Sequence, residues 1–163
     1  MKAIETARHN ITIENAYFVP PPELSKALIA AAKRGVNVQI VTNGATTHDN
    51  MPVFHASRYF YDELLEAGVR IYEKKGGTIH AKTATFDGAF SLIGSANLNG
   101  RSKGRDSEVI VAVKDRTLAR EMEDRFTTVL PPASEEVTLD TLRAESVRAN
   151  LKQWAWSTLA WML

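Results

Sequence analysis

The chain contains no cysteine, almost no net charge and no long apolar run. The absence of cysteine excludes disulfides, thiolate zinc sites and cysteine nucleophiles. A net charge of +1 gives no general attraction to nucleic acid, so a nucleic-acid partner is not expected. No apolar segment reaches the roughly 20 residues that a bilayer crossing needs, and the amino terminus lacks the apolar centre of a signal peptide. We therefore expect this chain itself to be soluble or peripheral to a membrane.

The 163 residues, 44% hydrophobic and 24% charged, are enough for one domain with a substantial core. Segments of β-branched and aromatic residues predict strands, and apolar residues spaced three and four apart predict helices. The expected strands are 10–19, 36–41, 69–72, 78–86, 89–93 and 108–113, and the expected helices are 22–34, 57–67, 116–129 and 138–163. This alternation predicts an α/β fold with a mixed central β-sheet flanked by helices. Pro131 and Pro132 mark a boundary between a domain of residues 1–131 and a C-terminal helical segment of residues 132–163.

One stretch, IHAKTATFDGAFSLIGSANLNGRS at residues 79–102, gathers the residues with the most evident chemistry. His80 and Lys82 are two residues apart in an expected strand, so their side chains should point to the same side. A neutral imidazole is a nucleophile and an ammonium group attracts an anion, so the pair suits attack on a phosphoryl centre. The ordinary alternative is a strand with two polar residues on a solvated face.

Polar residues that could complete such a site follow the return strand of the expected hairpin. Backbone donors at Gly94, the hydroxyl of Ser95 and the amide of Asn97 could surround the remaining phosphate oxygens. Glu108 opens the next expected strand and is placed to fold back and orient a ring nitrogen of the imidazole. Asp87 lies in an Asp-Gly turn, and we expect it to shape the hairpin more than to touch a substrate.

These positions read His80-x-Lys82-x4-Asp87-x6-Gly94-Ser95-x-Asn97, which matches the signature of the phospholipase D superfamily. The stretches AIETARHNITIENAYFVP, RGVNVQIV, LLEAGVRIYE, HAKTATFDG and GSANLNGRS also resemble the carboxy-terminal half of bacterial cardiolipin synthases. The resemblance implies a phospholipase D-like fold. It also implies a catalytic set of His80, Lys82, Asp87 and Glu108, and phosphate contacts from Gly94, Ser95 and Asn97. We add Arg101, from the basic cluster that follows the motif, as an expected phosphate or substrate contact.

The chemistry that the resemblance implies is phosphodiester transfer without a metal or other cofactor. One histidine attacks phosphorus and forms a phosphohistidine intermediate, while a second histidine protonates the leaving alcohol and then activates the acceptor. An enzyme of the cardiolipin-synthase type is a phosphatidyltransferase that moves a phosphatidyl group between phosphatidylglycerol-like lipids. Its parent protein would act at the cytoplasmic side of the bacterial inner membrane.

Members of this superfamily need two such motifs for one site, and this chain has one. His9, His48 and His55 are not followed by lysine two positions later. The resemblance therefore implies either a missing amino-terminal half with its own motif or a homodimer in which each copy supplies His80. The homodimer corresponds to the alternative function, a phospholipase D-like phosphodiesterase or nuclease. A further alternative is an inactive isolated half-domain that binds lipid or serves in assembly.

Other polar and aromatic groups allow both a functional and an ordinary interpretation. A basic cluster after the motif could hold a lipid head group or simply be solvated; it comprises Arg101, Lys103 and Arg105. His48, Asp49 and His55 could suggest a metal site, but a polar surface loop is the commoner explanation and we expect no metal. The three tryptophans all fall in the last ten residues, where they suit peripheral contact with a membrane or, equally, packing of a helix on the domain.

Overall fold

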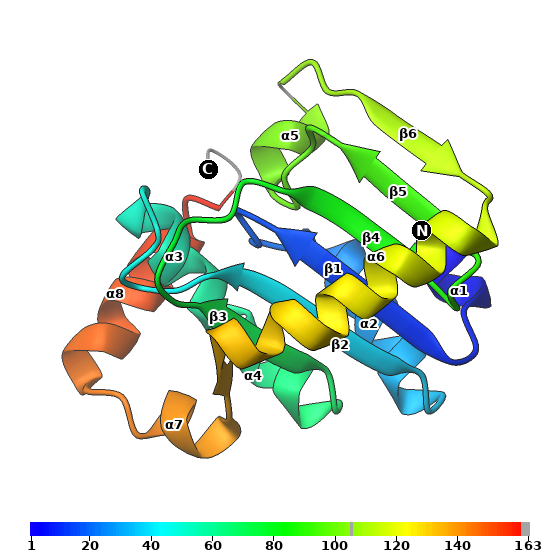
Figure 1. The fold of residues 1–163 in the computed structure, drawn as a ribbon. Helices are drawn as coiled ribbons and strands as arrows, with labels where there is room; N and C mark the ends of the chain where they lie inside the picture. Colours follow the sequence, from blue (N-terminus) through cyan, green and yellow to red (C-terminus); the bar gives the residue numbers. More distant parts are fainter. Residues whose placement is uncertain (105, 161–163) are drawn as a thin grey trace.

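The computed structural model describes residues 1–104 and 106–160, which form a central β-sheet with helices on both faces (Figure 1). Within these residues, seven strands pair in the order β6-β5-β4-β1-β2-β3-β7. The strands β1, β2 and β3 run parallel to one another, and every other pairing is antiparallel. Their bounds are β1 Asn10–Asn15, β2 Asn37–Asn43, β3 Arg70–Lys74, β4 Lys82–Phe86, β5 Phe90–Gly94, β6 Ile110–Val113 and β7 Ser134–Val137. The expected α/β fold with a mixed sheet is confirmed.

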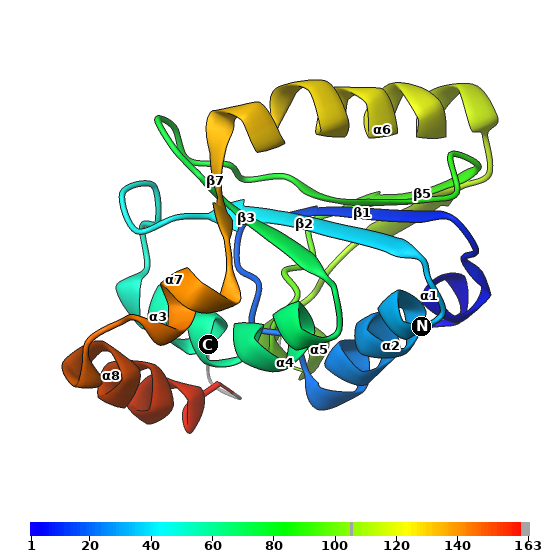
Figure 2. The ribbon, with the colours of Figure 1, turned by 90° about the horizontal axis from the view of Figure 1, so that it is seen from below.

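The helices divide unequally between the two faces of the sheet (Figure 2). One long helix, α6, crosses one face, and the other helices lie on the opposite side. Their bounds are α1 Lys2–Thr6, α2 Pro22–Lys33, α3 Met51–Tyr59, α4 Tyr61–Glu66, α5 Gly100–Gly104, α6 Arg116–Val129, α7 Leu139–Arg143 and α8 Val147–Ser157, with a 3₁₀ turn at Pro131–Ala133.

Local chemistry explains where the two longest helices begin and end. Pro22 occupies the first turn of α2, where its missing N–H would have no partner in any case. Gly35 follows the end of this helix with a φ of 88°, a conformation that glycine adopts without steric cost. The side chain of Asp115 caps α6 because it accepts a hydrogen bond from the N–H of Leu118 at 2.8 Å.

Apolar side chains fill both faces of the central strands. Ile11 of β1 and Ile40 of β2 are fully buried with Leu28 of α2 in the main core. On the other face, Phe126 of α6 packs in a second cluster that includes Tyr72 of β3. Parallel strands covered on both sides read as nearly continuous apolar runs, as these do.

The helix expected over 57–67 was wrong at its start and is interrupted. The observed helix α3 begins at Met51, because the side chain of Asn50 accepts a hydrogen bond from the N–H of Val53 and so caps it. Phe60 then ends α3 and directly precedes α4. The polar composition of the preceding loop concealed this capping residue.

The C-terminal segment of residues 132–163 was expected to be helical, with a helix over 138–163. The structure has the strand β7 before that range and two separate helices, α7 and α8, within it. The strand β7 pairs antiparallel with β3, so the C-terminal segment is joined to the main sheet. Helix α8 packs against α3, and Arg58 of α3 forms ion pairs with Glu73 of β3 and Glu145 of the α7–α8 connection. No helix in the described part of the chain has both the length and the apolarity that a bilayer crossing requires.

The tryptophans of α8 lie in different environments. Trp156 packs against a small cluster that contains Val19 and Val53, whereas Trp154 is 55% exposed. Trp161 lies outside the described residues. One side of the terminal helix therefore packs on the domain, while the other presents aromatic and aliphatic groups to solvent.

Candidate active site

Two buried asparagines end neighbouring parallel strands and hold the two loops that carry the motif. Asn15 ends β1 and Asn43 ends β2, and both are almost inaccessible to solvent. The carboxyl ends of parallel strands are where open α/β sheets commonly place their binding sites. Neither asparagine was among the expected site residues. The signal that could have found them is the asparagine that closes each apolar strand, in NITIEN and NVQIVTN.

Asn43 fixes the residue that precedes His80. Its Oδ1 atom accepts a hydrogen bond from the N–H of Ile79 at 2.9 Å, and its Nδ2 atom donates to the carbonyl of Ile79 at 3.0 Å. The side chain thus supplies the two bonds that a neighbouring strand would make. It does so where no strand is present, because β4 begins at Lys82 and not at residue 78 as expected. His80 lies just before β4 and is exposed.

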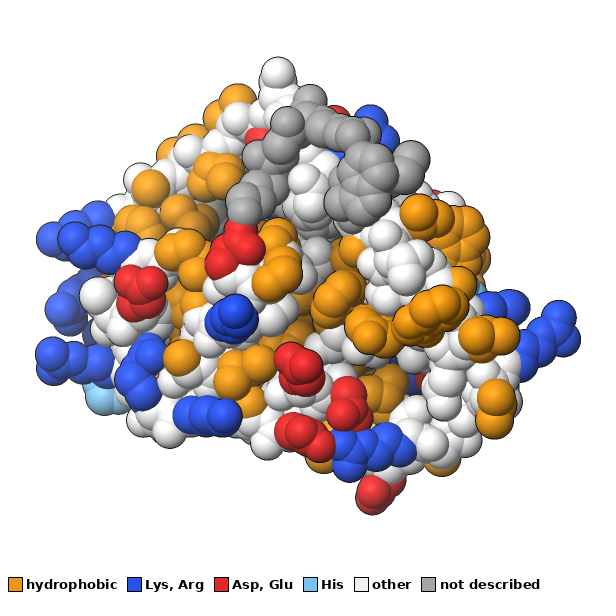
Figure 3. Space-filling model, turned by 180° about the vertical axis from the view of Figure 1, so that it is seen from behind, with side chains coloured by type: hydrophobic (Ala, Val, Ile, Leu, Met, Phe, Trp, Pro, Cys, Tyr) orange, Lys and Arg blue, Asp and Glu red, His pale blue; other side chains and the backbone are white. Residues whose placement is uncertain are grey.

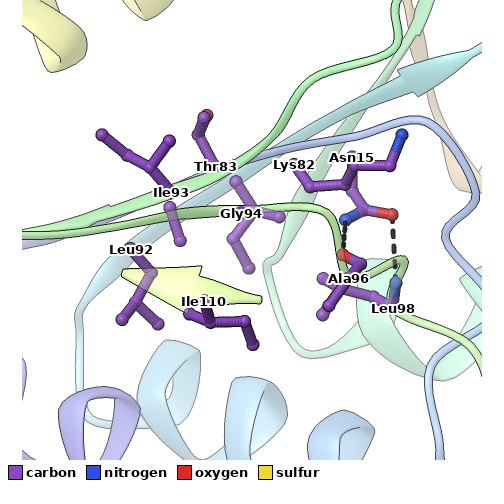
Figure 4. A pocket seen from close by; sticks show the side chains of 11 residues that line it. Asn15, Lys82, Thr83, Leu92, Ile93, Gly94, Ala96, Leu98 and Ile110 are labelled. Carbon is purple, nitrogen blue, oxygen red and sulfur yellow. Dashed lines mark hydrogen bonds between the residues drawn. The ribbon is translucent and has the colours of Figure 1, made fainter. Parts of the chain in front are cut away.

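Asn15 fixes the loop after β5 in a similar way (Figure 4). Its Oδ1 atom accepts hydrogen bonds from the N–H groups of Leu98 at 3.1 Å and Tyr17 at 3.2 Å. Its Nδ2 atom donates to the carbonyl of Ala96 at 3.3 Å. The loop that contains the Ser-x-Asn part of the motif is therefore held against the end of β1.

Lys82 is the buried cation of this corner. It lies opposite Asn15 in the β1–β4 ladder, is 9% exposed, and donates from Nζ to the backbone carbonyl of His80 at 2.7 Å. Burial lowers the pKa of Lys82 below its ordinary value, although the negative charges of Glu108 and Asp49 act in the opposite direction. An anion beside Nζ would offset the cost of burying this charge.

Glu108 holds the loop after β5 through two hydroxyl groups. The Oγ atom of Ser95 donates to Oε2 of this carboxylate, and the Oγ atom of Ser102 donates to Oε1 at 2.9 Å. Ser102 was not an expected site residue, and its Oγ atom also accepts the N–H of Asn97 at 3.2 Å. The strand β6 begins at Ile110, so Glu108 lies before it and not within it as expected. Its expected action on the imidazole stays a prediction.

Gly94 and Asn97 differ in what the fold requires of them. A Cβ atom at Gly94 would lie 2.2 Å from the carbonyl oxygen of Val109, so only glycine allows this close pairing of β5 with the start of β6. The Oδ1 atom of Asn97 is buried without a hydrogen-bond partner among the described residues. Buried polar atoms without partners are uncommon, and this oxygen could accept a hydrogen bond from a donor group of a ligand.

Asp87 lies at the end of β4 opposite to Lys82. Its carboxylate accepts hydrogen bonds from the backbone N–H groups of Arg8, His9 and Asn10 at 3.0, 2.8 and 3.0 Å. These bonds fasten the hairpin turn to the start of β1. The structure therefore separates Asp87 from the other motif residues, and the geometry supports a structural role in place of the catalytic one that the resemblance implied.

The basic cluster after the motif is described only in part. Arg101 is exposed and forms an ion pair with Asp106 at 3.0 Å. The side chain of Lys103 and the whole of Arg105 lie outside the described residues. In the described part, Arg101 is thus engaged by a carboxylate, and its expected contact with substrate stays a prediction.

A second polar group consists of Tyr17, which follows β1, and of His48 and Asp49 in the loop between β2 and α3. The hydroxyl of Tyr17 donates to Oδ1 of Asp49 at 2.7 Å, and its ring stacks on His48 with centroids 5.3 Å apart. Burial, this hydrogen bond and the charge of Asp49 raise the pKa of Tyr17 to about 12. Burial lowers the pKa of His48 to about 4 against the opposing charge of Asp49. His48 is therefore a neutral packing residue at physiological pH, and within the described residues no three potential metal ligands gather.

The corner formed by these loops carries groups whose charge and polarity suit a tetrahedral anion. Lys82 supplies positive charge, and the hydroxyl of Ser95 and the amide of Asn97 are polar groups of the adjoining loop. The exposed imidazole of His80 is accessible to an incoming ligand. Because Asn15 and Asn43 fix both loops by hydrogen bonds, the backbone of the corner is held in place. The hydroxyl of Ser95 donates to Glu108 here and would have to turn to donate to an anion.

A family model described as "Cardiolipin synthase, PLD-like domain" matches residues 1–130. The chain is 40% identical over 115 residues to cardiolipin synthase A of Yersinia pseudotuberculosis serotype O:1b (strain IP 31758). The same values hold for cardiolipin synthase A of Yersinia pestis bv. Antiqua (strain Angola). Each alignment covers 71% of this chain and 23% of the relative, so the chain spans less than a quarter of the length of these relatives.

Solved structures share the fold at low sequence identity. Nuc from Salmonella typhimurium, a phospholipase D family member, aligns with a TM-score of 0.72 and 23% identity over 84% of this chain and 87% of its own. Phosphatidylserine synthase of Haemophilus influenzae Rd KW20 aligns with a TM-score of 0.76 and 17% identity over 99% of this chain and 43% of its own. These alignments confirm the phospholipase D-like fold.

Proposed function

Because the chain belongs to the family of cardiolipin synthase, phospholipase D-like domains, we propose that it forms one half of a phosphatidyltransferase site. The substrate is a phosphodiester lipid such as phosphatidylglycerol. The observation that carries this proposal is the corner at the carboxyl ends of β1 and β2. Two observations support it: Asn43 and Asn15 hold the segment before His80 and the loop of Ser95 and Asn97 at this edge, and Nζ of Lys82 lies at the carbonyl of His80.

The proposed reaction is a double displacement at phosphorus. A ring nitrogen of His80 attacks the phosphorus atom, a phosphorus–nitrogen bond forms, and the bond to the leaving alcohol breaks. A second histidine gives its proton to that alcohol and then takes the proton of the acceptor hydroxyl, whose oxygen displaces the imidazole. Lys82 binds one non-bridging oxygen. Ser95, once its hydroxyl turns from Glu108, and the side-chain N–H of Asn97 bind another. His80 is equally suited to the role of the acid and base, with the partner histidine as the nucleophile.

The second histidine is supplied from outside this single motif. Two sources fit: another half-domain of a longer polypeptide, or a second copy of this chain in a homodimer. The high identity to cardiolipin synthases over a small part of their length favours the first source.

We place the activity at a membrane surface, at the cytoplasmic side of the bacterial inner membrane. Helix α8 supports this location, because Val147, Leu151 and Trp154 are exposed large hydrophobic residues on one of its sides. Arg148 and Lys152 are exposed next to them and would favour anionic lipid.

The experiment that tests the function is lipid analysis of cells that make the protein together with its natural neighbouring half. Labelled phosphatidylglycerol should be converted to cardiolipin by the wild type, in the presence of chelator, and His80→Ala should abolish the product. His9→Ala is the matched control, since His9 is an exposed histidine at the opposite end of the sheet, next to Asp87. Equal cardiolipin from wild type and His80→Ala would reject the proposal.

The second candidate is a homodimeric phosphodiesterase or nuclease. It is favoured by the single motif and by the alignment with Nuc over 87% of that chain. Gripping a polyanion usually takes several lysines or arginines in a stripe, and the net charge of +1 argues against this. Cleavage of single-stranded DNA by the isolated chain in the presence of chelator, together with a dimer in sedimentation, would favour the nuclease. An inactive strict monomer would leave the isolated chain as a half-domain without its own activity.

A further inference from the structure

A cavity of about 360 Å³ opens beside the candidate active site, between the sheet and helices α1 and α2. This volume lies in the range of small-molecule sites. One end is lined by Asn97, Ser102 and Glu108, which belong to the active-site corner, and the other end reaches Met1 and Ile4 of the amino-terminal helix. The cavity therefore has a polar end at the site of chemistry and extends away from it.

The long walls of this cavity are apolar. Ala84 and Phe86 of β4, Leu92 of β5, Ile110 of β6 and Leu24 of α2 line it. Figure 4 shows Leu92 and Ile110 on the side of the sheet that faces the helices. Seen from behind, hydrophobic side chains are exposed on this side of the molecule in the region of β6 (Figure 3). The polar lining residues of the cavity are Glu23 of α2, Asn97, Asn99, Ser102 and Glu108.

The buried cation Lys82 is the first residue of β4, the strand whose Ala84 and Phe86 line the cavity. Alternate residues of a strand share a face, so Lys82 precedes Ala84 and Phe86 on the cavity side. Lys82 and Asn15 line a smaller cavity of about 70 Å³. The two cavities share six wall residues, which are Ile13, Ala84, Leu92, Ala96, Leu98 and Ile110. The space beside Lys82 therefore adjoins the apolar cavity.

We propose that this cavity binds one acyl chain of the phospholipid whose phosphate lies at His80 and Lys82. The inference rests on the proposed function and adds to it the part of the substrate that does not react. The occupant follows from the shape and polarity of the space, since a negatively charged head joined to a flexible apolar chain matches a cation joined to an apolar cavity. Burial of the chain there supplies binding energy in proportion to the area removed from water.

The proposal is tested by methyl NMR on the 163-residue chain with decanoyl lysophosphatidylglycerol as the probe, below its micelle concentration. The methyl signals of Ala84, Leu92 and Ile110 should shift on titration. Glycerophosphoglycerol, which has the same head without the chain, should bind at least about tenfold more weakly, because about 1.4 kcal/mol of burial corresponds to that factor. Equal affinity for both probes would overturn the proposal.

Two substitutions inside the cavity and one outside it test where the acyl chain binds. Ala84→Phe fills the floor and Ile110→Trp fills the rim, and each should weaken binding of the lysolipid about tenfold. Val111→Trp is the matched control, because Val111 is the next residue of the same edge strand on the opposite face, and it is 53% exposed against 58% for Ile110. Its affinity should stay within about twofold of the wild type. If Ala84→Phe does not fold, the comparison of Ile110→Trp with Val111→Trp decides the result.

Three results would sink the acyl site: shifts confined to the methyl groups of Val147 and Leu151 on α8, unchanged affinity in the cavity variants, or equal weakening by Val111→Trp. Failure of the proposed function gives a different pattern. In that case the wild-type chain binds the lysolipid in the cavity, but the protein assembled with its neighbouring half makes no cardiolipin. Normal cardiolipin synthesis in Ala84→Phe and Ile110→Trp would instead reject the cavity and leave the function standing.

Discussion

The hydrogen bonds by which Asp87 fastens the β4–β5 turn to the start of β1 can be removed without changing a residue of the active-site corner. The substitution Asp87→Asn keeps an oxygen that can accept hydrogen bonds but removes the negative charge, whereas Asp87→Ala removes both. The native carboxylate accepts bonds from three consecutive backbone N–H groups, those of Arg8, His9 and Asn10. Asp87 also has a φ of 53°, a conformation that asparagine tolerates better than alanine.

The expected loss of stability follows from these bonds. A hydrogen bond to a charged group contributes about 1.5–3 kcal/mol when well shielded, and the partly exposed turn lies at the lower end of this range. We expect Asp87→Asn to lower the free energy of unfolding by about 1–2 kcal/mol, since weaker bonds remain. For Asp87→Ala we expect about 3 kcal/mol, because the N–H groups lose their acceptor and the backbone is strained.

The effect should depend on pH with a defined sign. Burial alone would raise the pKa of Asp87, but the N–H groups of Asn10, His9 and Arg8 outweigh it and hold the pKa below its ordinary value. The stabilisation is therefore complete above the unfolded-state pKa of about 3.9 and is lost as the pH falls through the lower folded-state value. Asp87→Asn should show a flatter stability profile below about pH 4.

Urea denaturation followed by tryptophan fluorescence and circular dichroism measures these differences. Asp106→Asn is the control, because the ion pair of Asp106 with Arg101 lies at the surface and should contribute less than about 1 kcal/mol. The reasoning would be refuted by an Asp87→Asn protein with wild-type stability that has lost phosphoryl transfer. That result would place Asp87 in contact with substrate.

Asn43→Ala removes both bonds to Ile79 and should lower the free energy of unfolding by about 2–4 kcal/mol in urea denaturation; transfer activity should fall more than stability, because the imidazole that follows loses its fixed position. Gly94→Ala should destabilise by about 2 kcal/mol or more, since its Cβ would lie 2.2 Å from the carbonyl oxygen of Val109, just before β6. A melting temperature within a degree of the wild type would contradict this. The pKa of His48 is about 4 in the folded protein and about 6.5 when unfolded, so the unfolded state binds the extra proton between these values and stability should fall as pH drops through that window. The His48→Gln variant should lose this pH dependence of the free energy of unfolding. The same pH profile in the variant and the wild type would contradict the reasoning. Trp154→Ser should reduce sedimentation with anionic vesicles several-fold, whereas unchanged sedimentation would mean that α8 does not face the membrane.

Elements with local signals were predictable from the sequence. The helix Arg116–Val129 was expected with its observed bounds, because its apolar spacing and the flanking residues all lie within one short segment. The strands around residues 10–15 and 37–43 were found for the same reason, with ends shifted by a few residues. The motif residues were found because their spacing is fixed along the chain.

Residues whose role depends on distant partners were missed. Asn43 binds a residue 36 positions away, and Asn15 binds Leu98, which is 83 positions away. A side chain that replaces a missing strand has no periodicity of its own to reveal it. The shortened β4 has the same cause, since the backbone of Ile79 is bonded to the side chain of Asn43 and not to a strand. The structure showed that Lys82 and Asp87 lie at opposite ends of β4, which the sequence spacing alone did not reveal.

The two asparagines that brace the motif loops are uncharged at every pH, and their bonds join them to uncharged peptide groups. Ionic strength and moderate acidity should therefore change the affinity of the corner for an anion without altering the part of its outline that the asparagines hold. Substitutions that change the charged side chains around the corner should therefore change which head groups bind. The loops held by Asn15 and Asn43 should keep their positions.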